Sequence, residues 1–188
     1  LLNGSRDAGF AFTGLRDDKP ILLMMGGSTG SRAVNAGLRS ALPQLLKEFH
    51  VIHLCGKGNL DEALQNRTDY KQFEYVSEGL NDLFAAADFV VSRAGSNSIS
   101  EFLALKKPSL LIPLSARASR GDQILNAASF EKQGFARVLD EDEMTAETMK
   151  KEIFALYENK EKYVVAMEKS PAGDGVAAVM TQIKALMR

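Results

Sequence analysis

The chain has 188 residues, of which 45% are hydrophobic and 25% charged, enough for one globular domain with a sizeable core. Its formal net charge of −1 argues against a nucleic-acid-binding surface, because such surfaces carry a basic stripe. No apolar run approaches the roughly 18 residues that cross a bilayer, and none is longer than Ile21 to Met25, which has the length of a strand.

Strand-like apolar runs alternate with helical patterns along the chain. Residues 1–20 lack an initiator Met and lead into the first run, so we expect the chain to be a fragment whose upstream domain is missing. Parallel strands joined by helices predict one α/β domain over residues 21–188, a doubly wound, Rossmann-like sheet with trailing helices from about Thr145. The six predicted strands are Ile21–Met25, Val51–Cys55, Gln72–Val76, Phe89–Val91, Ser109–Ile112 and Ala136–Leu139.

A glycine-rich loop follows the first predicted strand and includes Gly26, Gly27, Ser28 and Gly30. Glycine lets the backbone approach a ligand closely, and the Ser28 hydroxyl can donate to a phosphate or sugar. The spacing fits neither the dinucleotide fingerprint nor a P-loop. A tight turn in which a serine caps the next helix explains the loop equally well.

The only cysteine and the only histidines occur together near the second predicted strand. Cys55 excludes an internal disulfide and ends an apolar run, so we expect a buried structural thiol. His50 and His53 have an odd spacing, which places them on opposite faces of a strand. We therefore expect no metal site and no resident cofactor.

The most informative stretch is Ser92 to Glu101, between the fourth predicted strand and a helical pattern. Small residues here leave backbone N–H groups open at a helix start, which favours an anion such as a diphosphate. Glu101 lies one turn deeper, where a carboxylate can accept hydrogen bonds from a sugar diol. Alternatively, Ser98 and Glu101 have the spacing of a capping box, which needs no ligand.

A polar loop from Ser115 to Gln123 follows the fifth predicted strand. Asp122 and Gln123 can bind sugar hydroxyls, although Asp122 is equally suited to cap the next helix. Three arginines near these loops can face a diphosphate or simply remain solvated: Arg93, Arg117 and Arg120. Neither histidine lies on a predicted ligand loop, so the sequence offers no convincing general base.

Together, four segments resemble the C-terminal half of the MurG family of glycosyltransferases. They are GGSTGS from Gly26, HLCGKG from His53, SRAGSNSISEFLAL from Ser92 and SRGDQILNA from Ser119. The last two are most similar to the enzymes of low-GC Gram-positive bacteria. This family transfers N-acetylglucosamine from UDP-N-acetylglucosamine to undecaprenyl-diphospho-muramoyl-pentapeptide, converting lipid I to lipid II in peptidoglycan synthesis.

The resemblance implies the GT-B architecture, in which the C-terminal Rossmann-like domain holds the UDP-sugar without a metal. It implies that Ser28 contacts the donor and that Val76 meets the uracil through its backbone, with Leu80 packing nearby. The diphosphate-binding group then comprises Ser96, Asn97 and Ser98, Glu101 takes the ribose, and Asp122 and Gln123 take the N-acetylglucosamine. Asp122 departs from the glutamine of other branches.

The resemblance also places the acceptor site, the catalytic base and the membrane contact in a missing N-terminal domain. We therefore expect the whole enzyme to be peripheral on the cytoplasmic face of a bacterial membrane. The fragment itself is expected to be soluble, inactive and a weak binder of UDP-sugar. Two alternatives remain: another GT-B-like UDP-sugar enzyme such as an epimerase, or a non-catalytic nucleotide-binding module.

Overall fold

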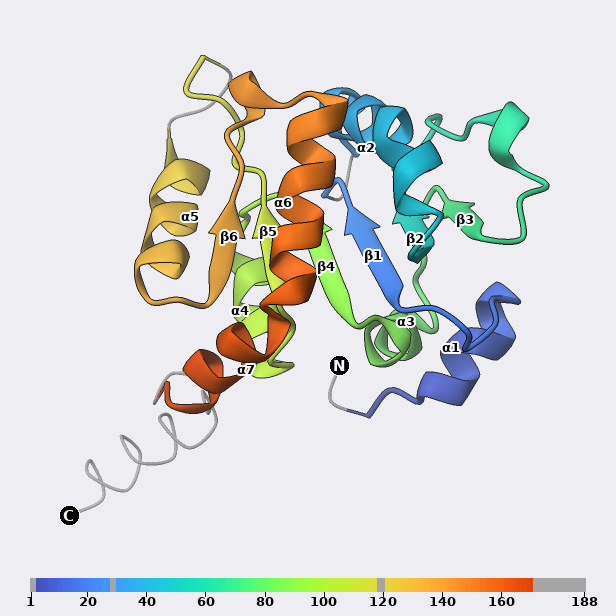
Figure 1. Ribbon diagram of the computed structural model, residues 1–188, viewed down its shortest axis with the longest axis horizontal. Coiled ribbons are helices and arrows are strands. Elements are labelled where there is room, and N and C mark those ends of the chain that lie inside the picture. The colour runs from blue at the N-terminus through green and yellow to red at the C-terminus, as the bar shows by residue number, and fades with distance from the viewer. Residues whose placement is uncertain (1–2, 28–29, 118–120, 171–188) are drawn as a thin grey trace.

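The computed structural model describes residues 3–27, 30–117 and 121–170, which form a parallel sheet covered by helices (Figure 1). Six strands are ordered β3-β2-β1-β4-β5-β6, and every neighbouring pair is parallel. This order and the doubly wound fold confirm the predicted fold class. The strands are β1 (Ile21–Met25), β2 (His50–Leu54), β3 (Tyr70–Phe73), β4 (Phe89–Ser92), β5 (Ser109–Leu111) and β6 (Ala136–Val138).

The third strand begins and ends earlier than predicted. β3 lies at the edge of the sheet and pairs only with β2, whose last residue, Leu54, is opposite Phe73. Because no partner strand continues beyond Leu54, the chain leaves the sheet at Phe73. Val76 therefore lies in the loop before the next helix.

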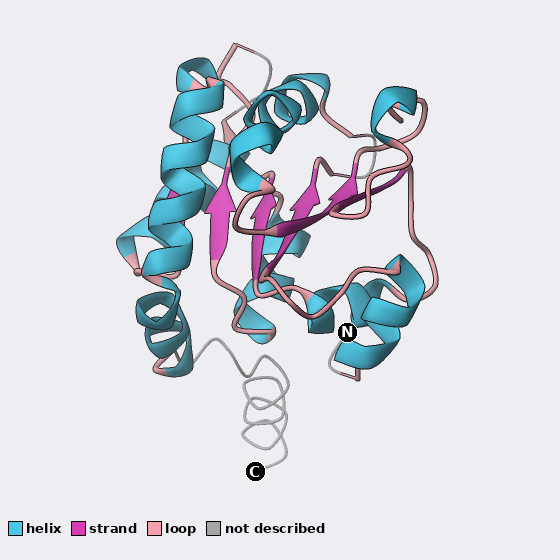
Figure 2. Ribbon diagram, turned by 45° about the vertical axis from the view of Figure 1, so that its right-hand side comes forward, coloured by secondary structure: helices cyan, strands magenta, loops and turns pink. Residues whose placement is uncertain are grey.

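Helices cover both faces of the sheet (Figure 2). The α-helices are α1 (Arg6–Thr13), α2 (Arg32–Leu45), α3 (Leu80–Ala86), α4 (Ser96–Ala104), α5 (Asp122–Lys132), α6 (Ala146–Glu158) and α7 (Lys160–Glu168). Two short 3-10 helices, η1 (Glu62–Leu64) and η2 (Glu141–Glu143), lie in connecting loops. Two of these helices, α6 and α7, follow Thr145 and meet at Asn159.

Alternate residues of the central strand β1 enter two separate cores. Leu22 and Met24 pack with apolar side chains of α2, α6 and α7, whereas Ile21 and Leu23 pack with those of α3 and α4. Side chains alternate between the two faces of a strand, and here both faces are buried. This explains why β1 reads as a continuous apolar run.

The part of the lead-in segment that the structure describes packs onto the domain. α1 is capped by Ser5 and lies against α3, and Arg6 donates to the carbonyl of Ala86 at 2.7 Å. A Cβ on Gly9 would lie 2.4 Å from the Asp82 carbonyl oxygen, so only glycine allows this close packing. Residues 3–20 are thus part of the same folded body.

The two histidines and the cysteine lie as expected. His53 is fully buried and contacts Asn35 on α2 and Tyr70 on β3, whereas His50 lies 2.6 Å from Asp18. Cys55 is a free, buried thiol, and burial raises its pKa. Among the described residues, no group of three His, Cys, Asp or Glu side chains is arranged to hold a metal. No helix in the described ranges is both long and apolar enough to span a bilayer.

Candidate functional site

Two adjoining hollows open at the carboxyl edge of the sheet, where the strand order reverses between β1 and β4. This switch point is where open α/β sheets bind ligands. The larger hollow, the cleft, has a volume of about 480 Å³, and the smaller one, the apolar pocket, about 120 Å³. Gly27 and Ser98 line both, so the two hollows lie next to each other. The cleft is lined by Gly26, Gly27, Gly30, Ser31, Arg93, Gly95, Asn97, Ser98, Leu114 and Gln123.

The glycine-rich loop forms one wall of the cleft. Gly27 and Gly30 have φ angles of 86° and 74°, which glycine adopts without strain. A Cβ on Gly30 would lie 2.3 Å from the carbonyl oxygen of Cys55, so the loop lies directly against the end of β2. Ser31 caps α2 by accepting from the backbone of Val34. The serine-capped turn is therefore present and also lines the cleft; Ser28 lies outside the described residues.

The start of α4 forms the opposite wall, and within the described ranges no side chain caps it. Its N-cap residue is Gly95, with φ −68° and ψ 140°, so Ser98 is the third residue inside the helix. The capping-box interpretation of Ser98 and Glu101 is wrong, because a capping box requires its serine at the N-cap. Asn97 and Ser98 line the cleft. The first N–H groups of α4 are therefore available to an anion in the cleft.

Two predicted site residues on α4 do not line either hollow. Ser96 is exposed at the first position of the helix, and Glu101 is half-buried one turn beyond Ser98. Within the described part of the chain, the Glu101 carboxylate has no hydrogen-bond partner. It lies on the helix whose start borders both hollows.

The apolar pocket contains both residues expected at the uracil. Val76 and Leu80 line it together with Met25 and Leu54, from the ends of β1 and β2. Glu74 and Tyr75 complete the rim. The Glu74 carboxylate accepts from the backbone N–H of Gly58 at 2.5 Å. A flat apolar ring fits this lining better than a charged group.

The start of α5 contributes one of its two predicted residues to the cleft. Gln123 lines it and accepts through Oε1 from the backbone N–H of Leu114 at 3.0 Å. Asp122 is exposed and does not line either hollow. The interpretation of Asp122 as a helix cap is wrong, because the N-cap is Gly121, with φ 89°, and Asp122 is the first helical residue.

Arg93 is neither a solvated arginine nor a free phosphate ligand. It is only 7% exposed and donates to Ser31, Glu141 and two backbone carbonyls. Burial acts to raise the pKa of Glu141, but hydrogen bonds from Arg93 and Ser115 outweigh it and leave that pKa below its ordinary value. The side chain of Arg117 is 87% exposed, and Arg120 lies outside the described ranges.

Sequence reasoning missed two side chains that organise the site. Asn126 on α5 donates to the Ala94 carbonyl at 3.0 Å, next to the start of α4. Glu141 pairs with Arg93. Their partners lie 32 and 48 positions away in the chain, so no local pattern reveals the contacts. The one available signal was an arginine immediately after a buried strand.

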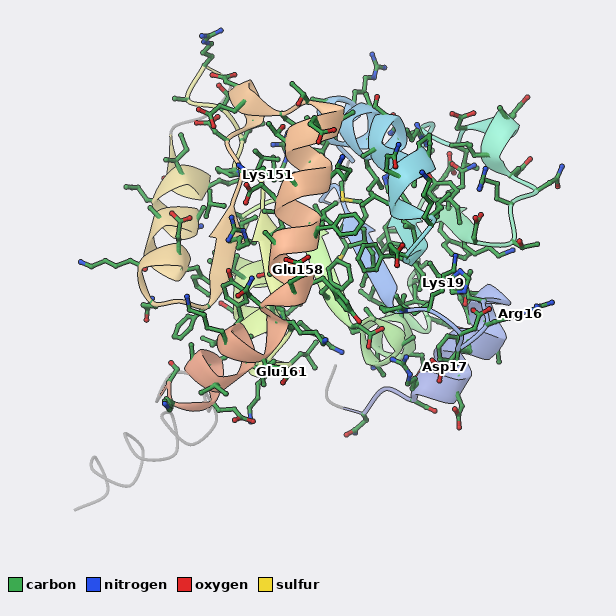
Figure 3. The ribbon with its side chains drawn as sticks, in the orientation of Figure 1. Arg16, Asp17, Lys19, Lys151, Glu158 and Glu161 are labelled. Atoms are coloured by element: carbon green, nitrogen blue, oxygen red, sulfur yellow. The ribbon has the colours of Figure 1, made fainter. Side chains whose placement is uncertain are left out.

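The cleft is built for binding and offers no proton-transfer group. Its lining includes hydroxyls, amides, glycines and Arg93, and among the described residues no carboxylate or imidazole. Charged side chains of both signs lie instead on the outside of the layers (Figure 3). Those labelled are Arg16, Asp17, Lys19, Lys151, Glu158 and Glu161.

Comparison with known proteins identifies similar chains. Residues 21–183 match the glycosyltransferase family 28 C-terminal domain. A Bacillus cereus protein named UDP-N-acetylglucosamine--N-acetylmuramyl-(pentapeptide) pyrophosphoryl-undecaprenol N-acetylglucosamine transferase 2 is 51% identical over 97% of this chain and 52% of its own length. A Clostridium botulinum transferase is 53% identical over 98% of the chain and 52% of its own length. The chain thus spans about half the length of these relatives.

A solved structure shares the fold. The crystal structure of Acinetobacter baumannii MurG matches 95% of this chain with a TM-score of 0.70 and 23% sequence identity. The match covers 53% of that protein. The likeness at this level of identity concerns the fold alone.

Proposed function

Because the chain belongs to the glycosyltransferase family 28 C-terminal domain family, we propose that it is the donor-binding half of an N-acetylglucosaminyltransferase. Its donor is UDP-N-acetylglucosamine, and the whole enzyme acts on the lipid-linked muramoyl-pentapeptide of peptidoglycan synthesis. The observation that carries the proposal is the uncapped start of α4, which opens onto the cleft at the switch point of the sheet.

The diphosphate occupies the cleft against the first turn of α4. The N–H groups of Asn97 and Ser98 lack capping partners there, and the helix dipole contributes about 0.3–1 kcal/mol toward a nearby anion. Each hydrogen bond to the charged phosphates adds roughly 1.5–3 kcal/mol. Gly27 and Gly95 have no Cβ to restrict the space, since a Cβ at either would meet no atom within 4 Å.

The other parts of the donor extend in two directions from the diphosphate. The uracil enters the apolar pocket against Val76 and Leu80, and Glu101 accepts the ribose hydroxyls. The sugar lies toward the start of α5, where Gln123 lines the cleft and Asp122 is one residue away. Ser28, on the glycine-rich loop, completes the set of donor contacts.

The proposed reaction is an inverting displacement at the anomeric carbon. An acceptor hydroxyl forms the new C–O bond from one side, while the bond to the UDP oxygen breaks on the other. The leaving diphosphate takes the electron pair, and the α4 N–H groups stabilise its charge. The described lining of the cleft holds no base, and in this proposal the acceptor's proton passes to a group in the half of the enzyme that precedes this domain. The lipid acceptor and the peripheral membrane contact belong to that half too.

Calorimetry with four ligands tests this function. We expect UDP-N-acetylglucosamine and UDP to bind more tightly than NAD or ATP. An epimerase needs an acid or base beside the sugar, which the described lining does not supply. Preference for NAD or ATP would overturn the proposal in favour of a general nucleotide-binding module. Turnover of the lipid acceptor by these residues alone would contradict the assignment of the chain as only the donor-binding half.

Replacing Glu101 with alanine is expected to weaken UDP binding at least tenfold, because one hydrogen bond to a charged group contributes roughly 1.5–3 kcal/mol. The melting temperature should hardly change, since the carboxylate caps no helix. Binding isotherms with UDP and with 2′-deoxy-UDP measure the effect. The loss should shrink for the deoxy ligand, which lacks one ribose hydroxyl.

Ser100→Ala is the matched control for this variant. Ser100 lies on the same helix and is exposed, with its hydroxyl bonded to the Ser96 carbonyl. It should leave both affinities unchanged. An equal loss for UDP and 2′-deoxy-UDP in Glu101→Ala would remove Glu101 from the ribose site.

A further inference from the structure

Three separate segments meet at the cleft, and each needs a fixed position for the cleft to hold a diphosphate. They are the glycine-rich loop before α2, the β4–α4 turn and the loop that follows β5. A single side chain, Arg93, reaches all of them. Its Nη1 donates to the carbonyls of Ile112 and Pro113, each at 3.2 Å.

The other end of the Arg93 guanidinium contacts the remaining walls. Nη2 donates to Ser31 Oγ at 2.7 Å and to Glu141 Oε1 at 2.5 Å. Glu141 Oε2 in turn accepts from the backbone N–H of Ser115 at 2.9 Å. The side chains of Arg93 and Glu141 are only 9% and 14% exposed, so both charges are held inside the protein.

We propose that the Arg93–Glu141 ion pair is a positioning device that fixes the spacing of the three cleft walls around the diphosphate. The inference rests on the proposed function, since it assigns these residues a task toward the same ligand. Arg93 acts through the segments it holds, because both Nη atoms already donate to protein acceptors.

The chemistry of the Arg93–Glu141 ion pair suits a role in positioning the cleft walls better than a role in stabilising the fold. Replacing a buried ion pair by well-packed apolar residues is often neutral or stabilising, so stability alone is weak grounds for such a pair. The planar guanidinium bridges several acceptors in fixed directions, which a lysine ammonium cannot reproduce. None of the residues that the pair contacts lines the apolar pocket, so its influence should be confined to the diphosphate end.

The chain provides a matched control at the β6 edge of the sheet. Arg137 on β6 pairs with Glu152 on α6, and their side chains are 33% and 15% exposed. Neither residue lines the cleft or the apolar pocket. Arg137→Lys and Glu152→Gln therefore perturb an ion pair of the same kind without touching a cleft wall.

The experiment compares Arg93→Lys and Glu141→Gln with these controls. Binding of UDP and of uridine is measured at a temperature where circular dichroism shows every variant folded. We expect UDP to bind at least tenfold more weakly to both Arg93→Lys and Glu141→Gln, while uridine affinity changes less than twofold. The control variants should keep both affinities within twofold. The double variant should lose no more than the worse single variant, because the pair acts as a unit.

Amide hydrogen exchange gives a readout without any ligand. In Arg93→Lys and Glu141→Gln, exchange should accelerate at the hydrogen-bonded amides of the three segments and stay unchanged on β2 and β3. These amides belong to Gly30, Ile99, Leu114 and Ser115. Unchanged UDP affinity in both variants, or equal losses for UDP and uridine, would overturn the positioning role. If the wild-type chain binds neither UDP nor its sugar ester, the proposed function itself fails, and this inference fails with it.

Discussion

Replacing Gly95 with aspartate is expected to weaken UDP-N-acetylglucosamine binding at least a hundredfold without destabilising the domain. Gly95 is the N-cap residue of α4, and its φ of −68° and ψ of 140° suit any residue. A Cβ there meets no atom within 4 Å. Aspartate is among the best N-caps, and its charge favours a helix start. The melting temperature should therefore stay the same or rise.

The carboxylate introduced by Gly95→Asp competes with the diphosphate for the same hydrogen-bond donors. It accepts hydrogen bonds from the first N–H groups of α4, at Asn97 or Ser98, and these are the proposed diphosphate donors. It also places a negative charge beside the diphosphate. The natural chain leaves this helix uncapped, which is the trade of stability for binding expected at a functional site.

Two further variants separate charge from bulk. Gly95→Asn caps the helix with a neutral side chain of nearly the same shape and should lose less affinity than Gly95→Asp. Gly95→Ala adds only a methyl group and should lose least. Calorimetry and thermal melts on all three measure binding and stability together. Undiminished affinity in Gly95→Asp would show that the donor does not use the start of α4.

Acidification is expected to destabilise the domain through His53. This side chain is fully buried, and burial, helped by the charge of Arg39, lowers its pKa from 6.5 to about 3. Between those values the unfolded chain binds a proton that the folded chain excludes. Stability therefore increases with pH in this window. The contribution of neutral His53 to the free energy of unfolding is fully present above pH 6.5. Below that pH, the free energy of unfolding falls by up to about 1.4 kcal/mol for each pH unit.

The hydrogen bonds around His53 explain why the neutral form is needed. Asn35 Nδ2 donates to the Cys55 carbonyl at 2.8 Å, so Asn35 Oδ1, 2.9 Å from His53 Nε2, accepts from that nitrogen. His53 Nδ1 then accepts from the Tyr70 hydroxyl at 2.7 Å. A second proton on the ring disrupts this arrangement. The network holds the Cys55 carbonyl, against which Gly30 packs, so acid should also loosen the glycine-rich loop.

Denaturant unfolding between pH 4 and pH 8 measures the dependence. His53→Asn should be less stable at neutral pH yet lose less stability on acidification. His50→Gln removes the other histidine, which lies on the opposite face of β2, and should retain most of the acid sensitivity. A wild-type free energy of unfolding that does not change from pH 7 to pH 5 would contradict this account.

The sheet was predictable because its central strands are buried on both faces. Apolar runs such as Ile21–Met25 identify strands, and alternation with helices leaves few topologies. Helix starts were harder to predict. Ser98 and Asp122 are of residue types that favour the N-cap position, but Gly95 and Gly121 occupy the N-caps of α4 and α5. Local preference predicts that a cap exists near a residue, whereas backbone geometry decides which residue occupies it.

The candidate site was predictable where it depends on strand ends. Asn97, Ser98, Gln123 and the loop glycines do line the cleft, and Val76 and Leu80 line the apolar pocket. Ser96, Glu101 and Asp122 lie beside these hollows and not in their lining. The buried role of Arg93 was beyond prediction, because its acceptors come from Ser31, Ile112, Pro113 and Glu141, which only the folded sheet brings together.

A crystal structure with UDP-N-acetylglucosamine tests the central claim most directly. We predict that the diphosphate oxygens lie within hydrogen-bond distance of the backbone N–H groups of Asn97 and Ser98. The uracil should lie in the apolar pocket against Val76. Density for the nucleotide elsewhere on the molecule, or a diphosphate that avoids the start of α4, would contradict the account.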